Sequence, residues 1–160
     1  DTTKSTNENL KSLNIFLIFL KKINQNIIFT YPNADKDFQI YINKIEKFSA
    51  NKNFFLIKNL GKINYFSLLK ISDLVIGNSS SGIIETASFK IPTINLGKRQ
   101  DGRYSNINVI NSSFKEKDIF KAYKYAISKK FQNKIKNIKN IYYKKDCSKN
   151  FIKHLYDLLN

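Results

Sequence analysis

Short apolar runs alternate with amphipathic segments throughout this chain of 160 residues. In the clearest run, Asp-Leu-Val-Ile at residues 73–76, the apolar residues are consecutive rather than spaced by two. Strands of this kind are typical of a parallel sheet that helices cover on both faces. The other predicted strands are residues 26–31, 54–58, 92–96 and 108–110, and the predicted helices are residues 6–23, 35–48, 64–72, 81–89, 115–130 and 148–159. The sequence therefore predicts an α/β fold with a Rossmann-like parallel sheet and helices on both faces.

The length predicts one domain, because 160 residues with 42% apolar side chains can bury a core. The longest apolar run, residues 15–20, is shorter than the roughly 20 residues that cross a bilayer. No signal peptide is recognisable, so we expect a cytoplasmic protein without membrane contact. The chain opens in a predicted helix, capped by Thr6 or Asn7, and we expect a strand to precede this helix in a longer polypeptide.

The composition gives little support to metal, disulfide or nucleic-acid chemistry. One Cys (Cys147) and one His (His154) make neither an internal disulfide nor a metal cluster, and we expect both to be passive. The net charge of +16 is compatible with nucleic-acid binding. However, the basic residues are almost all Lys and are spread along the chain, whereas nucleic-acid-binding proteins concentrate Arg for bidentate contacts. We therefore expect no metal, no cofactor and no nucleic-acid partner.

Glycine and arginine concentrate in one window of the sequence. Four of the five glycines lie between positions 77 and 102, and the only two arginines are Arg99 and Arg103. Glycine permits unusual backbone angles and the close approach of a ligand. A guanidinium group binds phosphate through two parallel hydrogen bonds. We expect the functional site in this window.

A Ser-rich turn follows the clearest predicted strand and leads into a predicted helix. Ligands of open α/β sheets bind at this carboxyl edge, and the free amides of a helix start attract anions. Ser79, Ser80 and Ser81 add hydroxyl donors, and Gly82 would let a phosphate approach the backbone. Glu85 lies one turn further on and suits the ribose, because a carboxylate accepts hydrogen bonds from a vicinal diol. The alternative is a capped helix after a flexible turn, for which Ser is an ordinary choice.

Two more loops leave predicted strands at the same edge. One holds Lys98, Arg99 and Arg103, whose charges suit a phosphate or an acidic neighbour. Alternatively, Arg103 or Lys98 only solvates the loop or pairs with an acidic residue such as Glu85. The other loop holds Asn33, which suits a substrate hydrogen bond and a helix cap equally well.

The segment from Gly77 to Arg103, GNSSSGIIETASFKIPTINLGKRQDGR, resembles the signature of the hydrolysing UDP-N-acetylglucosamine 2-epimerases. The sequence YPNAD at residues 31–35 resembles the same family, and the resemblance runs in order from Asp1 to about Ile110. It implies a two-lobed GT-B-like enzyme. Residues 1–160 would be its nucleotide-binding C-terminal lobe, with residues 140–160 as a C-terminal helix or tail. The N-terminal lobe would lie outside this sequence.

The resemblance also implies roles for single residues. Ser79 and Ser80 would hold the diphosphate of UDP, Glu85 its ribose, and Asn33 and Arg99 other parts of the nucleotide. Backbone atoms near the end of the strand predicted at residues 54–58, at Leu60, would lie beside the uracil.

The reaction of this family begins with loss of UDP across C1 and C2 of the sugar, which gives a glycal. Water then adds, releasing N-acetylmannosamine for sialic or legionaminic acid synthesis. The groups that move protons come largely from the N-terminal lobe, so we expect no catalytic residue in this sequence. They would lie upstream of Asp1, and a His-Pro pair of similar proteins would fall just before it. We expect the whole protein to be an enzyme and a homo-oligomer, and the chain alone to be inactive.

Several alternatives stay open at this point. A GT-B glycosyltransferase lobe would bind the same UDP-sugar but pass the sugar to an acceptor. A relative could act on a diacetylated bacillosamine nucleotide, and a non-hydrolysing epimerase would keep its product nucleotide-linked. A Lys-rich nucleic-acid-binding module would instead bind any polyanion with an affinity that falls steeply with salt.

Overall fold

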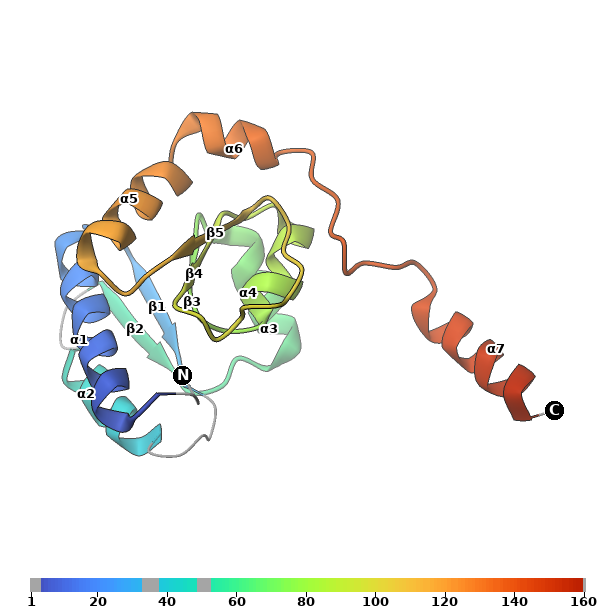
Figure 1. Cartoon of the computed structure of the whole chain (residues 1–160), viewed down its shortest axis with the longest axis horizontal. Helices are drawn as coiled ribbons and strands as arrows, with labels where there is room; N and C mark the ends of the chain where they lie inside the picture. Colours follow the sequence, from blue (N-terminus) through green and yellow to red (C-terminus); the bar gives the residue numbers. More distant parts are fainter. Residues whose placement is uncertain (1–3, 33–37, 49–52, 160) are drawn as a thin grey trace.

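Helices and strands alternate along the chain (Figure 1). The computed structural model describes residues 4–32, 38–48 and 53–159. The helices are α1 (Thr6–Lys22), α2 (Phe38–Phe48), α3 (Gly61–Ile71), α4 (Ser81–Ile84), the 3-10 helix η1 (Thr86–Phe89), α5 (Glu116–Ala126), α6 (Lys129–Ile135) and α7 (Cys147–Leu159). Within these ranges, no helix combines the length and the hydropathy that a bilayer-spanning segment requires.

The strands form two parallel sheets. One sheet pairs β1 (Ile27–Thr30) with β2 (Phe54–Ile57), and the other has β3 (Val75–Gly77), β4 (Thr93–Leu96) and β5 (Val109–Ser112) in that order. The predicted α/β class with parallel strands is confirmed. The single sheet that we expected is divided, however, because β1 and β3 do not pair with each other.

Helices cover both faces of the three-stranded sheet. On one face, α5 packs against β4 and β5 and also contacts α1, and on the other face α4 packs against β4. All four residues of β4 are buried. Ile94 and Leu96 belong to the core between β4, α1 and α5, whereas Thr93 faces η1, where its hydroxyl donates to Thr86. The buried hydrophobic cluster consists of Phe16, Leu17, Phe19, Leu20, Ile45, Phe48, Phe54, Ile94, Leu96, Ile119, Ala122 and Ala126.

The start of α1 differs from the prediction, since its cap is Ser5 rather than Thr6 or Asn7. The Ser5 hydroxyl oxygen accepts a hydrogen bond from the Glu8 amide (3.3 Å), and the Glu8 carboxylate accepts one from the Ser5 amide (2.9 Å). This reciprocal arrangement is a capping box, which satisfies two backbone donors of the first turn. The hydrogen bonds from Ser5 hold the pKa of Glu8 below its usual value.

Two further predictions need correction. The helix predicted over residues 115–130 is divided into α5 and α6, because the Ser128 hydroxyl oxygen accepts from the Phe131 amide (3.2 Å) and caps a new helix. The strand predicted at residues 73–76, which we expected to be buried, occupies residues 75–77 as β3 and is only half-buried. Its edge away from β4 has no strand neighbour among the described residues.

The C-terminal helix α7 stands apart from the rest of the molecule, and none of its residues is buried (Figure 1). The segment before it is attached to the body. The Asn140 side-chain amide donates to the Ile84 carbonyl and to the Ser88 hydroxyl, both at 2.7 Å. The Tyr142 hydroxyl donates to the Tyr104 carbonyl at 2.6 Å. The tail is thus fixed as far as Tyr142.

Candidate functional site

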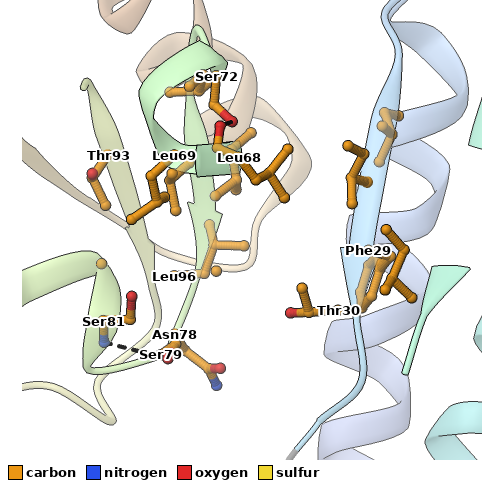
Figure 2. A pocket seen from close by; sticks show the side chains of 18 of the residues that line it. Phe29, Thr30, Leu68, Leu69, Ser72, Asn78, Ser79, Ser81, Thr93 and Leu96 are labelled. Atoms are coloured by element: carbon orange, nitrogen blue, oxygen red, sulfur yellow. Dashed lines mark hydrogen bonds between the residues drawn. The ribbon is translucent and has the colours of Figure 1, made fainter. Parts of the chain in front are cut away.

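A cavity of about 1500 Å³ lies between the two sheets and reaches the carboxyl ends of β1 and β3. Phe29 and Thr30 of β1 face Asn78 and Ser79, which follow β3, across this space (Figure 2). The carboxyl edge of parallel strands is where open α/β sheets bind their ligands. The cavity is therefore the candidate site.

The structure brings most of the predicted site residues to this cavity. Those that line it are Ser79, Ser81, Gly82, Glu85 and Arg99. Ser80 is the N-cap residue of α4 and lies outside the lining, with its carbonyl accepting from the two amides that follow Gly82. Arg103 is exposed on the next turn, also outside the lining, and Asn33 lies outside the described residues. The Ser-rich turn and Arg99 thus share one edge of the fold.

The Asn78 carbonyl ties the loop after β4 to the turn after β3. Arg99 Nη1 donates to this oxygen at 3.4 Å, and Gln100 Nε2 donates to it at 2.8 Å. Gln100 is 7% exposed, so the shorter of these hydrogen bonds is shielded from water. Because β3 and β4 are parallel neighbours, both loops leave the sheet on the same side. The contact positions the Arg99 guanidinium beside the hydroxyl groups of the turn.

A chain of hydrogen bonds orients Glu85. The Ser81 hydroxyl donates to Glu85 Oε2 at 2.6 Å, so its oxygen can only accept from the hydroxyl of Tyr65, with which it is also in contact. Burial is the main cause that raises the pKa of Tyr65 above its usual value, and the Glu85 charge adds to it against the opposing effect of the Ser81 hydrogen bond. Tyr65 therefore stays protonated and acts as the donor. The Ser81 hydroxyl proton is thus used in the hydrogen bond to Glu85 and is not donated to a ligand.

Tyr65 was not predicted from the sequence. It lies on α3, 16 residues before Ser81, and lines the same cavity. The only signal in the sequence is a tyrosine in the helix that precedes β3, and this does not reveal that its hydroxyl meets Ser81 of α4.

Gly82 and a buried hydroxyl cluster fix α4 on the sheet. A Cβ atom at Gly82 would lie 3.1 Å from Thr93 Cγ2, so glycine allows the helix to approach β4 closely. The Thr86 hydroxyl donates to the Gly82 carbonyl at 2.8 Å and accepts from Thr93 (2.8 Å) and from Asn108 (3.0 Å). Gly82 therefore has a packing role that the sequence analysis, which gave it only phosphate contact, did not foresee.

The donors available to an anion are local groups rather than a long helix. α4 has four residues, and the macrodipole of one turn is small. The Ser81 amide donates to Ser79 Oγ (3.4 Å) and the Gly82 amide to the Ser79 carbonyl (3.2 Å). No hydrogen bond of the Ser79 or Ser80 amide is present within the described part of the chain. These two amides, the Ser79 hydroxyl proton and the Arg99 guanidinium are the donors that this edge presents to an anion.

Within residues 4–32, 38–48 and 53–159, no group of three His, Cys, Asp or Glu side chains lies close enough together to hold a metal ion.

Substitution of Gly97 by Ala is expected to destabilise the loop that carries Arg99. Gly97 has φ of +75°, and an added Cβ atom would lie 2.8 Å from Phe114 Cε2. Strain at such a φ costs about 1–3 kcal/mol for other residues, which corresponds to a decrease in Tm of about 2–12 °C at this size. Gly102→Ala is the matched control, because Gly102 has φ of +83° but nothing within 4 Å. Thermal denaturation should show the larger decrease for Gly97→Ala, and equal decreases would exclude the Phe114 contact.

Parallel strands, a cavity at their carboxyl edge and a Ser-Gly turn beside an arginine together define an α/β domain with a candidate anion site. The model of the family described as UDP-N-acetylglucosamine 2-epimerase matches residues 2–156, and the chain belongs to this family.

Two curated relatives match this sequence over most of its length. A GDP/UDP-N,N'-diacetylbacillosamine 2-epimerase (hydrolyzing) of Campylobacter jejuni is 42% identical over 132 residues, which are 81% of this chain and 33% of the relative. The polysialic acid biosynthesis protein P7 of Escherichia coli is 30% identical over 158 residues, 99% of this chain and 40% of the relative. The chain thus spans well under half the length of these relatives.

Solved structures agree on the fold. The UDP-GlcNAc 2-epimerase of Methanocaldococcus jannaschii, in complex with UDP-GlcNAc and UDP, superimposes with a TM-score of 0.73 at 20% identity, covering 95% of this chain and 41% of that one. The UDP-GlcNAc 2-epimerase of Neisseria meningitidis bound to UDP-GlcNAc gives a TM-score of 0.64 at 18% identity, covering 92% and 41%. The predicted GT-B-like fold class is confirmed by this likeness.

Proposed function

We propose that residues 1–160 form the UDP-binding C-terminal lobe of a two-lobed hydrolysing UDP-sugar 2-epimerase. The observation that carries this proposal is that Ser79, Glu85 and Arg99 line one cavity at the carboxyl edge of the strands. Membership of the epimerase family supports the class of reaction. A second lobe elsewhere in the protein is supported by the 33% to 41% of each relative that the chain spans.

UDP would lie across this edge. The Ser79 hydroxyl, the amides of Ser79 and Ser80, and the Arg99 guanidinium suit the diphosphate, since charge-assisted hydrogen bonds are about twice as strong as neutral ones. Glu85, held by Ser81, is placed to accept from ribose hydroxyls. Leu60 lines the same cavity, which supports a uracil contact by the backbone at that end. Asn33 and Arg103 stay predicted contacts.

The lobe would act by stabilising a leaving group. In the elimination step, a proton leaves C2 of the sugar while the bond between C1 and the diphosphate oxygen breaks, and UDP departs from a glycal. Water then adds a hydroxyl group to C1 and a proton to C2 on the opposite face, so that the free sugar is the 2-epimer. Fixed donors aimed at charge that develops during a reaction contribute about 3–4 kcal/mol each. Arg99 and Ser79 would supply this effect, and proton transfer would fall to the other lobe.

The substrate we propose is a UDP-linked N-acetylated amino sugar. The names of the relatives support this class, one for a diacetylated bacillosamine nucleotide and one for polysialic acid synthesis. UDP-N-acetylglucosamine and its diacetylated bacillosamine counterpart differ at C4 and C6 of the sugar, and we propose that the product serves nonulosonic acid synthesis. The C1–C2 chemistry and the UDP contacts are the same for both.

Product analysis of the full-length protein tests this function. Incubation with UDP-N-acetylglucosamine or with the diacetylated bacillosamine nucleotide should release free 2-epimeric sugar and one equivalent of UDP without any acceptor. If UDP were released only when an acceptor is present, with the sugar transferred to that acceptor, the protein would be a glycosyltransferase. If the epimer stayed linked to the nucleotide, it would be a non-hydrolysing epimerase. Salt-sensitive polynucleotide binding without UDP binding would favour the Lys-rich binding module instead.

Tyr65→Phe is expected to weaken UDP binding without unfolding the protein. The variant removes the donor to Ser81, so Glu85 loses part of its orientation. The net contribution of a hydrogen bond is about 0.5–1.5 kcal/mol, which predicts an increase in Kd of about 2- to 10-fold in calorimetric titration of the full-length protein. Tyr125→Phe is the control, because it removes the hydroxyl group from a tyrosine that packs on Phe131 and does not line the cavity. If both variants bound UDP equally well, Tyr65 would have no part in the site.

A further inference from the structure

The end of β3 leaves a niche on the face of the sheet that α4 covers. Gly77 pairs in register with Asn95 of β4, so the two residues project to the same face of the sheet. Thr93, two residues before Asn95, contacts Thr86 of η1, which identifies this face as the one beside α4 and η1. A Cβ atom added at Gly77 would meet nothing within 4 Å, and both Gly77 and Asn95 line the cavity. The missing side chain thus lets the cavity extend across β3 to β4.

Asn95 presents a buried acceptor to this niche. Its side chain is 3% exposed, and Nδ2 donates to Asn111 Oδ1 of β5 at 2.9 Å. Because the oxygen and the nitrogen of an amide group point in different directions, Asn95 Oδ1 lies away from β5 and toward Gly77. This oxygen has no hydrogen-bond partner among the described residues.

An unpartnered buried oxygen calls for an explanation, because nearly all buried polar groups in proteins have a partner. In the described part of the chain, Gln100 Oε1 and Asn108 Oδ1 share this property, but neither residue lines the cavity. Of the three, only Asn95 is placed to meet a bound molecule. Its carbonyl oxygen accepts from a hydroxyl or N–H group and not from phosphate, whose oxygens are themselves acceptors.

β4 lies on the side of the cavity that carries the Ser-rich turn. Figure 2 shows Thr93 and Leu96, the two ends of β4, on the same side as Asn78 and Ser79. Leu60 follows β2, which belongs to the other sheet. A nucleotide with its base at Leu60 and its diphosphate at Ser79 would therefore direct the group attached beyond the diphosphate toward the niche.

We propose that Asn95 is a specificity-determining residue, whose Oδ1 accepts a hydrogen bond from a hydroxyl or N–H group of the sugar of the substrate. This inference rests on the proposed function, because it assigns the sugar of the same UDP-linked substrate. The ribose hydroxyls are assigned to Glu85 and the uracil to Leu60, and the diphosphate has no donor to give. The sugar supplies the donors that remain.

Asn95→Leu in the full-length protein tests this contact. Leucine keeps a side chain branched at the same carbon and removes the acceptor. The Kd for UDP, measured by calorimetry, should change less than about 3-fold. The kcat/KM for the UDP-linked amino sugar that the unaltered protein hydrolyses should fall about 5- to 100-fold, because a buried donor of the sugar would lose its partner. The Tm without ligand should not decrease, since an apolar side chain needs no hydrogen-bond partner.

Two results with this variant would overturn the proposal. If UDP binding and kcat/KM decreased by the same factor, Asn95 would support the fold or the nucleotide and not the sugar. If neither changed, an ordered water molecule rather than the substrate would account for the buried oxygen.

Asn111→Ala is the matched control. It removes the same hydrogen bond from Asn95 Nδ2 but keeps Asn95 Oδ1. The kcat/KM should stay within about 3-fold of the unaltered value, because the expected contact is made by the oxygen. An equal loss in Asn111→Ala and Asn95→Leu would assign the effect to the hydrogen bond between the two asparagines and would overturn the proposal.

Gly77→Ala tests the niche independently, also in the event that Asn95→Leu fails to fold. The added methyl group has room in the structure, so the Tm should not decrease. It would occupy the space beside Asn95 Oδ1, and one extra carbon in a binding pocket lowers kcat/KM by about 10-fold or more. The Kd for UDP should stay within about 3-fold. A kcat/KM equal to that of the unaltered protein would show that the sugar does not enter the niche.

The unaltered protein separates this inference from the proposed function. If it bound no UDP and released no sugar, the proposed function would fail and the sugar contact with it. If it did both, while Asn95→Leu and Gly77→Ala kept full kcat/KM, the function would stand and only the role of Asn95 would be wrong.

Discussion

Replacing Glu85 by Gln should weaken UDP binding to the full-length protein by about 10- to 100-fold. Glutamine keeps the shape of the side chain and can still accept from the Ser81 hydroxyl, which lies 2.6 Å from Glu85 Oε2. Glutamine lacks the negative charge, however, and a hydrogen bond to a charged group contributes about 1.5–3 kcal/mol. Because about 1.4 kcal/mol corresponds to a tenfold change in Kd, this loss gives the expected range. Calorimetric titration with UDP measures this difference directly.

The ribose assignment of Glu85 has its own test. The unaltered protein should bind UDP more tightly than 2′-deoxy-UDP, and this preference should shrink in Glu85→Gln because the missing hydroxyl is the one that the carboxylate accepts from. Glu116→Gln is the matched control, since Glu116 makes its ion pair with Lys22 and neither residue lines the cavity. A preference for UDP that is the same in Glu85→Gln and in the unaltered protein would show that Glu85 does not contact the ribose.

Phe19→Ala is expected to cause the largest loss of stability, about 3–5 kcal/mol in the free energy of unfolding. Phe19 is 0% exposed, and its ring lies edge-on to the rings of Phe120 and Tyr123, with ring centroids 4.9 and 5.7 Å apart. These contacts join α1 to α5. Truncation removes the buried area and leaves a cavity, and both effects destabilise the core. The expected loss is a large share of the roughly 5–15 kcal/mol that stabilise a typical domain.

Urea denaturation checks this value, with Phe151→Ala on α7 as the control. Phe151 is 63% exposed, so its truncation should change the midpoint little. The slope of the transition should stay the same in both variants, because a changed slope would indicate an altered unfolded state rather than a weakened core. A loss below about 1 kcal/mol for Phe19→Ala would contradict the placement of this ring between α1 and α5.

Much of the fold follows from local patterns in the sequence. The strands and helices occur where apolar runs and amphipathic segments predicted them, because burial on a sheet or on a helix face imposes these periods. The cap of α1 was predicted wrongly: Ser5 and Glu8 have the spacing of a capping box, but we assigned the cap to Thr6 or Asn7, which are equally ordinary cap residues. The division of the strands into two sheets could not be predicted, because local sequence patterns do not show which strands pair with each other.

The candidate site was predictable in its position and only partly in its details. Ser79, Glu85 and Arg99 were found from residue types at the ends of predicted strands, and all three line the cavity. Tyr65 was missed because its contact with Ser81 joins two helices, and local sequence does not encode helix packing. The packing role of Gly82 was missed for the same reason, as it depends on the distance to Thr93.

Asn140 attaches the segment between α6 and α7 to the body of the domain. Its amide group holds the carbonyl of Ile84 and the hydroxyl of Ser88, at the end of α4 and in η1, while its Oδ1 accepts from the Tyr142 amide at 2.9 Å. Loss of this one amide group would therefore leave the Ile84 carbonyl and the Ser88 hydroxyl without the partner that joins them to the stretch before α7. The last turn of α4, next to Glu85, is in this way connected to a segment more than 50 residues further along the chain.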